Sequence, residues 1–94
     1  MNPLSEREQK INERLQRTFA PLACQLTDES ALHAGHEGAK SGGGHYRLTI
    51  VAAAFAGQNR ITRHRLVYDS LRDMMQTEIH AMAITALAPS EVPE

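Results

Sequence analysis

The sequence predicts an α+β fold: a single small domain in which two helices pack on one face of a three-stranded mixed sheet. Two segments carry apolar residues at helical spacing, three alternate apolar and polar residues as strands do, and glycine or proline separates them. A chain of 94 residues can bury one modest core but not two. We therefore expect one domain over 1–94, with its core over about 4–88 and a short acidic tail over 89–94.

The first helix is predicted near the N-terminus and ends before Pro21, because proline cannot continue a helix. Charged residues occupy its other faces, while its apolar residues recur at helical spacing: Leu4, Ile11, Leu15 and Phe19.

Two strands follow, joined by a glycine-rich segment. Over 22–27 the alternation places Leu22, Cys24 and Leu26 on one face. The second strand begins at residue 45 and has an apolar face of four residues: Tyr46, Leu48, Ile50 and Ala52. Residues 31–44 show no hydrophobic period and predict a loop, across which the two strands pair antiparallel.

A second helix and a third strand complete the domain. After a turn at 55–59, the helix is predicted over 60–76, with an apolar stripe of Ile61, His64, Tyr68, Leu71 and Met75, widened by Val67 and Met74. Residues 79–88 alternate but are rich in alanine; we favour a strand, because a two-stranded sheet would leave apolar edges open. The element order, αββαβ, resembles that of the KH module found in bacteria, the class II KH arrangement.

Charge and composition limit the classes of function. Ten lysine and arginine residues against eleven aspartate and glutamate residues give a net charge of −1, so nucleic-acid binding would require a local basic patch. The single cysteine excludes an internal disulfide and fits a reducing compartment. No apolar run approaches the length of a membrane span, and the N-terminus lacks the apolar core of a signal peptide. We expect a cytoplasmic protein without membrane association.

No arrangement of residues predicts catalysis. We find neither a nucleophile with an accompanying base nor paired carboxylates beyond the "DES" at a strand end. Cys24 lies on the apolar face of a predicted strand, which is typical of a core residue rather than a reactive thiol. We expect a protein that is not an enzyme and has no catalytic residues.

Two groups of residues are candidates for binding. Arg60, Arg63, His64 and Arg65 begin the second helix, where unpaired backbone N–H groups favour anions, so they predict either a phosphate or partner contact or a solvated basic turn. The loop and the strands beside it contain four histidines whose neutral imidazoles suit Zn, Cu or Fe: His33, His36, His45 and His80. Spacing alone leaves a metal site and a merely polar loop as alternatives.

Several segments together resemble the BolA family. They are "DES", "GGGHYRLTIV", "FAGQNRITRHRLVYDSL" and "EIHAMAI", and the match covers about residues 4–88. The resemblance implies an αββαβ fold related to the KH topology. It also implies a protein that binds a monothiol glutaredoxin and shares a 2Fe-2S cluster with it, in iron homeostasis or iron–sulfur cluster trafficking.

The resemblance also implies which residues bind the cluster. Glutaredoxin and glutathione would each supply a thiolate and this chain two ligands, so the isolated chain is not expected to hold the cluster. His80 matches the family's histidine at the start of the last strand, and His33 is the better match to its loop histidine, with His36 as the competitor. His45 is expected as a neighbour or a structural residue, and His64 as a packed, hydrogen-bonded one.

The alternative function is of a different class. Bacterial BolA-like proteins are associated with transcriptional control of morphology and stress-response genes, which implies DNA binding. Arg60, Arg63 and Arg65 would then contact phosphate, although the net charge of −1 argues against strong binding by the chain alone. Whether the free chain forms a homodimer is left open.

Overall fold

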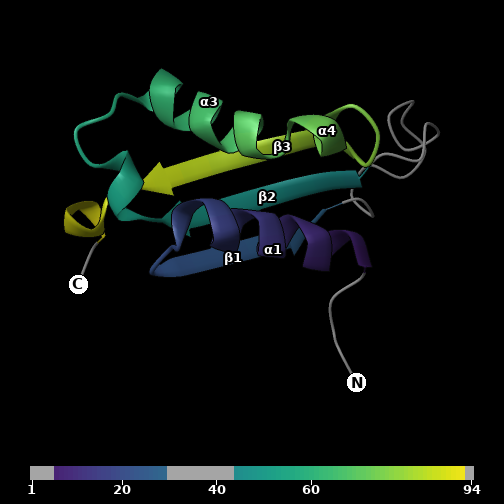
Figure 1. The fold of residues 1–94 in the computed structure, drawn as a ribbon, viewed down its shortest axis with the longest axis horizontal. Coiled ribbons are helices and arrows are strands. Elements are labelled where there is room, and N and C mark those ends of the chain that lie inside the picture. Colours follow the sequence, from purple (N-terminus) through teal and green to yellow (C-terminus); the bar gives the residue numbers. More distant parts are fainter. Residues whose placement is uncertain (1–5, 30–43, 93–94) are drawn as a thin grey trace.

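The computed structural model describes residues 6–29 and 44–92. Its elements, labelled as in Figure 1, are α1 (Glu6–Phe19), β1 (Ala23–Asp28), β2 (Gly44–Val51), η2 (Ala53–Phe55), α3 (Arg60–Ser70), α4 (Arg72–Met75), β3 (Ile79–Leu87) and η3 (Pro89–Glu91). The predicted α+β order is confirmed. The predicted second helix is divided at Leu71 into α3 and the single turn α4, and two short 3-10 helices follow β2 and β3.

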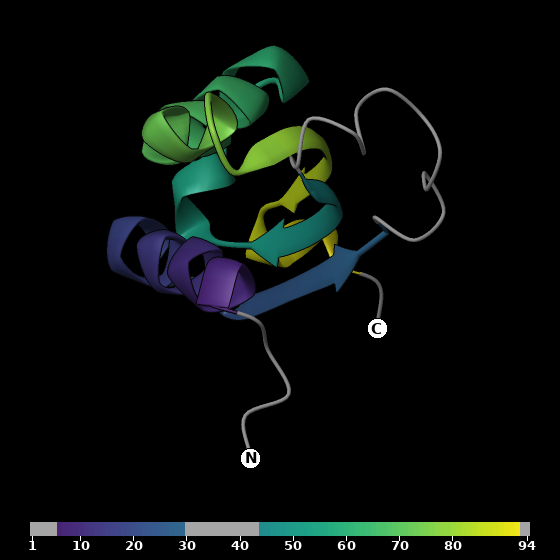
Figure 2. The same ribbon diagram turned by 90° about the vertical axis from the view of Figure 1, so that its right-hand side faces the viewer.

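The sheet has the strand order β1-β2-β3, so β2 is the central strand. β1 pairs with β2 antiparallel, and β2 pairs with β3 parallel, which confirms the predicted mixed sheet. A parallel pair requires a crossover connection, and α3 provides it. Figure 2 shows α1 and α3 on the same side of the sheet, and the other face has no helix among the described elements.

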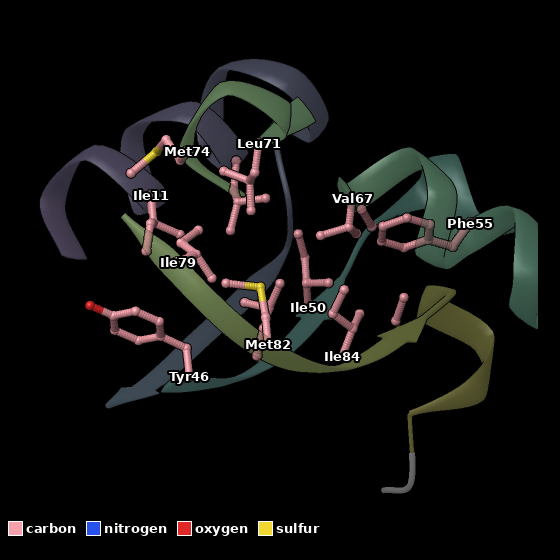
Figure 3. Packing of buried hydrophobic residues seen from close by; sticks show 14 residues of the cluster. Ile11, Tyr46, Ile50, Phe55, Val67, Leu71, Met74, Ile79, Met82 and Ile84 are labelled. Carbon is pink, nitrogen blue, oxygen red and sulfur yellow. The ribbon is translucent and has the colours of Figure 1, made fainter. Parts of the chain in front are cut away.

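The core lies between the sheet and the helices (Figure 3). The predicted apolar face of β2 is confirmed, since Tyr46 is 4% exposed and Leu48, Ile50 and Ala52 are fully buried. From α1, Ile11 and Leu15 are also fully buried. Leu4, predicted on the same stripe, lies outside the described residues.

The stripe predicted for the second helix is wrong at two positions. Ile61 is 65% exposed and Tyr68 is 37% exposed, whereas the residues that face the sheet are Val67, Leu71 and Met74. The helix carries apolar residues on two adjacent faces, and only the face with Val67 and Leu71 packs on the sheet. Tyr68 lies at the rim, from which its hydroxyl donates a hydrogen bond to the carbonyl oxygen of Met82.

Two further predictions need correction. Phe55 was expected in a turn, but it is fully buried in η2 and packs on Phe19, with 5.2 Å between the ring centroids. Leu22 was expected on the apolar face of the first strand, but β1 begins one residue later and the Leu22 side chain is 74% exposed. Cys24 and Leu26, on the same predicted face, are half-buried against the core.

Candidate functional site

The site begins where β2 and β3 start, at the same end of the sheet, because the two strands run parallel. Gly44 pairs with Ile79, and the next residue, His45, pairs with Ala81. The register therefore skips His80, which is the extra residue of a β-bulge. Bulges bend the strand and re-aim a side chain.

The bulge brings two histidine rings together. The centroids of the His45 and His80 rings are 5.0 Å apart, with 46° between the planes. His80 is exposed, whereas His45 is half-buried and its Nε2 atom is shielded from solvent. His80 therefore faces solvent with one side of its ring against His45.

Backbone hydrogen bonds hold the three strands together at this end. The Glu29 N–H donates to the His45 carbonyl at 2.8 Å, and the Gly44 N–H donates to the Glu78 carbonyl at 3.1 Å. The chain leaves the described part of the fold at Glu29 and returns at Gly44. His33 and His36 belong to the intervening segment and lie outside the described residues, so their predicted role stays a prediction.

A groove of mixed charge borders this end on the side covered by α1. It has a volume of about 590 Å³ and is lined by Glu6, Arg7, Lys10, Asp28, Tyr46 and Glu78. The Lys10 ammonium lies 2.6 Å from the Glu78 carboxylate, and burial raises the pKa of the Tyr46 hydroxyl. With acidic and basic groups facing each other, the groove does not select for one sign of charge.

The described residues do not form a complete metal site. Within 6–29 and 44–92, no three histidine, cysteine, aspartate or glutamate side chains gather closely enough to hold a metal ion. What this part of the chain can contribute is the exposed imidazole of His80, supported by His45. That donor suits a metal group whose other ligands come from elsewhere.

The predicted basic cluster separates into two kinds of arginine. Arg60 and Arg65 are exposed, but the side chain of Arg63 is only 12% exposed. Its guanidinium donates to the backbone carbonyls of Gln58 at 2.8 Å and Ala86 at 2.9 Å. It also donates to both carboxylate oxygens of Glu91, at 2.6 and 3.0 Å. Arg63 therefore joins α3 to the end of β3 and to η3.

Glu91 is a residue that the sequence reasoning missed, because it lay in the predicted tail. Arg63, with a further hydrogen bond from the Ala88 N–H, lowers the Glu91 pKa from its usual 4.5 to about 2. A signal was available: proline at the first helical position and glutamate two residues later are typical of a helix start. Gly44 and Tyr46, next to His45, were also missed as site residues.

His64 and Cys24 lie away from the histidine pair. His64 is half-buried and lines, with Arg60 and Arg63, a cleft of about 440 Å³ between α3 and the C-terminal part of β3. Burial raises the pKa of the Cys24 thiol, which keeps it protonated and less nucleophilic. No helix in the described part of the chain is long and apolar enough to cross a membrane. The predicted cytoplasmic location stays a prediction.

Comparisons with known proteins point in one direction. A family model described as "BolA-like protein" matches residues 15–91. The chain is 37% identical over 94 residues to SufE-like protein 1, chloroplastic/mitochondrial, of Arabidopsis thaliana, and 38% identical over 93 residues to Protein BOLA1, chloroplastic, of the same plant. These matches cover 95% and 96% of this chain but only 25% and 58% of the relatives' own lengths.

A bacterial relative and two solved structures extend these findings. The chain is 32% identical over 76 residues to the DNA-binding transcriptional regulator BolA of Escherichia coli K12, with 81% of this chain and 70% of that protein covered. The BolA domain of SufE1 from Arabidopsis thaliana superposes with a TM-score of 0.84 at 38% identity, covering 95% of this chain and 99% of that one. BolA1 from the same plant gives 0.82 at 38% identity, covering 96% and 99%.

Proposed function

Because the chain belongs to the BolA-like family, we propose that it docks on a monothiol glutaredoxin and contributes histidine ligands to a 2Fe-2S cluster that the two proteins share. Its role is then binding, in iron homeostasis or iron–sulfur cluster trafficking, and not catalysis. The observation that supports this proposal is the exposed His80 on the β-bulge, with the His45 ring beside it.

The residues of this chain suit a ligand set completed by another protein. His80 is exposed at the sheet end and is accessible to a metal group arriving from outside. The second ligand is His33, with His36 as the competitor, on the segment that leaves the described fold at Glu29. His45 supports the His80 ring from the half-buried side.

Imidazole ligands would set the charge and the reduction potential of a bound cluster. With two neutral imidazoles in place of two thiolates, a bound cluster would carry less negative charge and have a higher reduction potential, and only unprotonated imidazole would hold it. Such ligation suits a cluster that is sensed or transferred.

We place the docking surface next to His80, on the sheet face opposite the helices. Ala81, Ala83 and Thr85 of β3 are exposed and alternate with the buried residues of that strand. Their small side chains leave the sheet accessible to a partner's surface. Arg60 lies near the opposite end of β3, Arg65 is exposed on the same helix, and both would flank this surface.

The test is reconstitution of the complex. The purified chain, a monothiol glutaredoxin, glutathione, iron and sulfide are combined without oxygen, and visible absorption and circular dichroism are recorded. We expect His80→Ala to remove the bands typical of histidine ligation, while the matched control His64→Gln, away from the sheet end, leaves them unchanged. Between His33→Ala and His36→Ala, the variant that removes the bands identifies the loop ligand. A complex of His80→Ala with an unaltered spectrum would falsify the ligand assignment.

A DNA-binding role is the second candidate. Two observations favour it: the Escherichia coli relative is named a DNA-binding transcriptional regulator, and Arg60 and Arg65 are exposed on α3. If this surface contacts phosphates, each of Arg60→Ala and Arg65→Ala should lower the slope of log affinity against log salt by about 1. The control is Arg72→Ala, an exposed arginine on α4. If the salt slopes of Arg60→Ala and Arg65→Ala equal that of Arg72→Ala, these two arginines do not contact DNA phosphates.

A further inference from the structure

Gly44 is buried against the ring of Tyr46. A Cβ atom added at Gly44 would lie 2.5 Å from Cε2, 2.7 Å from Oη and 2.8 Å from Cζ of Tyr46. Non-bonded carbon atoms are most stable at about 3.5–4.0 Å, so the ring and a side chain at position 44 cannot occupy these positions together. Gly57 is the only described glycine with a positive φ, so glycine is needed at 44 for space and not for backbone conformation.

The Tyr46 side chain packs on the core, and it also lines the groove beside α1. The residue is 4% exposed and belongs to the core cluster with Ile11, Ile79 and Met82. Figure 3 shows it at the end of this cluster, on β2. A side chain at position 44 would therefore displace either the ring from the core or the start of β2 from its place.

The start of β2 sets the position of His80. The Gly44 N–H donates to the carbonyl of Glu78, two residues before His80, and Lys10 of α1 holds the Glu78 carboxylate. The register shift between Gly44 and His45 leaves His80 as the extra residue of β3, with its ring against His45. A displacement of Gly44 would change both the shift and the ring contact.

We propose that Gly44 is a positioning residue for His80: by leaving space for the Tyr46 ring, it holds the bulge that brings the His80 ring against His45. This inference rests on the proposed role of His80 as a ligand and adds to it the residue that orients the ligand before the partner arrives. Gly44 itself has no side chain and is not proposed as a ligand.

The test uses NMR of the free chain. The cross-peak between the ring protons of His45 and His80, and the imidazole shifts of His80, report the arrangement without cluster or partner. We expect Gly44→Ala to lose the cross-peak and shift the His80 signals. The double variant Gly44→Ala/Tyr46→Leu should regain both, because the shorter side chain relieves the contact.

Gly57→Asn is the matched control. A Cβ at Gly57 has no atom within 4 Å, and asparagine tolerates the positive φ of 75° at that position, so the His45–His80 cross-peak should persist. The inference is overturned if Gly44→Ala keeps the cross-peak and the His80 shifts. It is also overturned if the double variant regains neither the cross-peak nor the original His80 shifts. If Gly44→Ala unfolds, a double variant that is no better folded overturns the inference as well. The proposed function fails by a different result: an unaltered cluster spectrum of the His80→Ala complex would show that His80 is not a ligand, whatever the NMR result for Gly44→Ala.

Discussion

Arginines that are close in the sequence differ in what their side chains contact. Arg63 lies four residues before Val67, on the side of α3 that faces the sheet, and its guanidinium is hydrogen-bonded to two carbonyls and one carboxylate. Arg60 and Arg65 lie on exposed positions of the same helix. The basic segment therefore has a structural member and two members that are accessible to a partner.

Arg63→Ala should destabilise the fold, whereas Arg65→Ala should not. Removal of the Arg63 guanidinium leaves the Gln58 and Ala86 carbonyls and the Glu91 carboxylate without this donor. We expect a clear fall in the urea midpoint for Arg63→Ala and a change within error for Arg65→Ala, measured by far-UV circular dichroism at pH 7. Equal midpoints for the two variants would contradict the structural role of Arg63.

The described histidines show how position decides the role of one residue type. His45, on the regular part of β2, is half-buried, whereas His80, the extra residue of the bulge, is exposed. Their rings are nevertheless 5.0 Å apart. The alternation of the strands alone does not predict this contact, because a bulge changes the register by one residue.

At the scale of elements, α3 both connects two strands and covers the edge of the sheet. β3 is an edge strand, and its outward carbonyl groups could pair with another chain. Two α3 side chains donate hydrogen bonds to such carbonyls. The Tyr68 hydroxyl donates to the carbonyl of Met82, and the Arg63 guanidinium donates to the carbonyl of Ala86. The helix thereby restricts strand addition along this part of β3.

The position of the apolar stripe can be tested with two aliphatic residues. Leu71 is fully buried, and Leu71→Ala should cost about 2–5 kcal/mol through lost burial and a cavity. Ile61 is 65% exposed, and Ile61→Ala should change the free energy of unfolding by no more than about 0.5 kcal/mol. Urea unfolding of both variants tests whether Ile61 belongs to the buried stripe. Similar losses of unfolding free energy in the two variants would show that Ile61 is buried, as the sequence predicted.

At the scale of the molecule, ion pairs join segments that are distant in the sequence. Lys10 of α1 pairs with Glu78 before β3, and Arg14 of α1 pairs with Asp73 of α4 at 2.7 Å. Arg14 lowers the pKa of Asp73 from its usual 3.8 to about 2, as Arg63 does for Glu91. The N-terminal helix is thus held by two charged pairs, and the C-terminal segment is held by the Arg63–Glu91 pair.

These lowered pKa values predict acid destabilisation. A carboxylate whose pKa is lower in the folded state contributes stability above its unfolded pKa and loses it as pH falls toward the folded value. For Glu91 the loss should occur between pH 4.5 and about 2, and for Asp73 between 3.8 and about 2. Urea unfolding of the unmodified chain should therefore show a lower midpoint at pH 3 than at pH 7.

The variants Glu91→Gln and Asp73→Asn supply the control for this prediction. Each removes one titrating carboxylate, so each should start from a lower midpoint at pH 7 and lose less on going to pH 3. Added salt should weaken the effect in the unmodified chain, because the Asp73 side chain is 69% exposed and the Glu91 side chain 44% exposed. A pH dependence that is the same in all three proteins would exclude these pairs as its source.

Local patterns predicted more of the fold than of the site. The period of two in β2 identified Tyr46, Leu48 and Ile50 as core residues, because a strand at the centre of a sheet with one covered face must alternate. The same reasoning failed for Phe55, since a 3-10 turn has no period to recognise, and for Ile61, since the pattern did not show which face packs. At the site, imidazole chemistry made His45 and His80 two of four candidate ligands, and the resemblance assigned their roles. Their contact is visible only in the structure.

By itself, the sequence determined the order of the elements, the core-facing side of β2 and, through its motifs, the family. Each of these depends on residues near one another in the chain, where spacing and propensity act directly. Only the tertiary structure decided that Arg63 is bound to Glu91, that Tyr46 covers Gly44 and that His80 meets His45. Pairs such as Arg63–Glu91 and His45–His80 join residues far apart in the chain, and the space at Gly44 depends on how the Tyr46 ring packs. The spacing of neighbouring residues in the sequence predicts neither the pairs nor the packing.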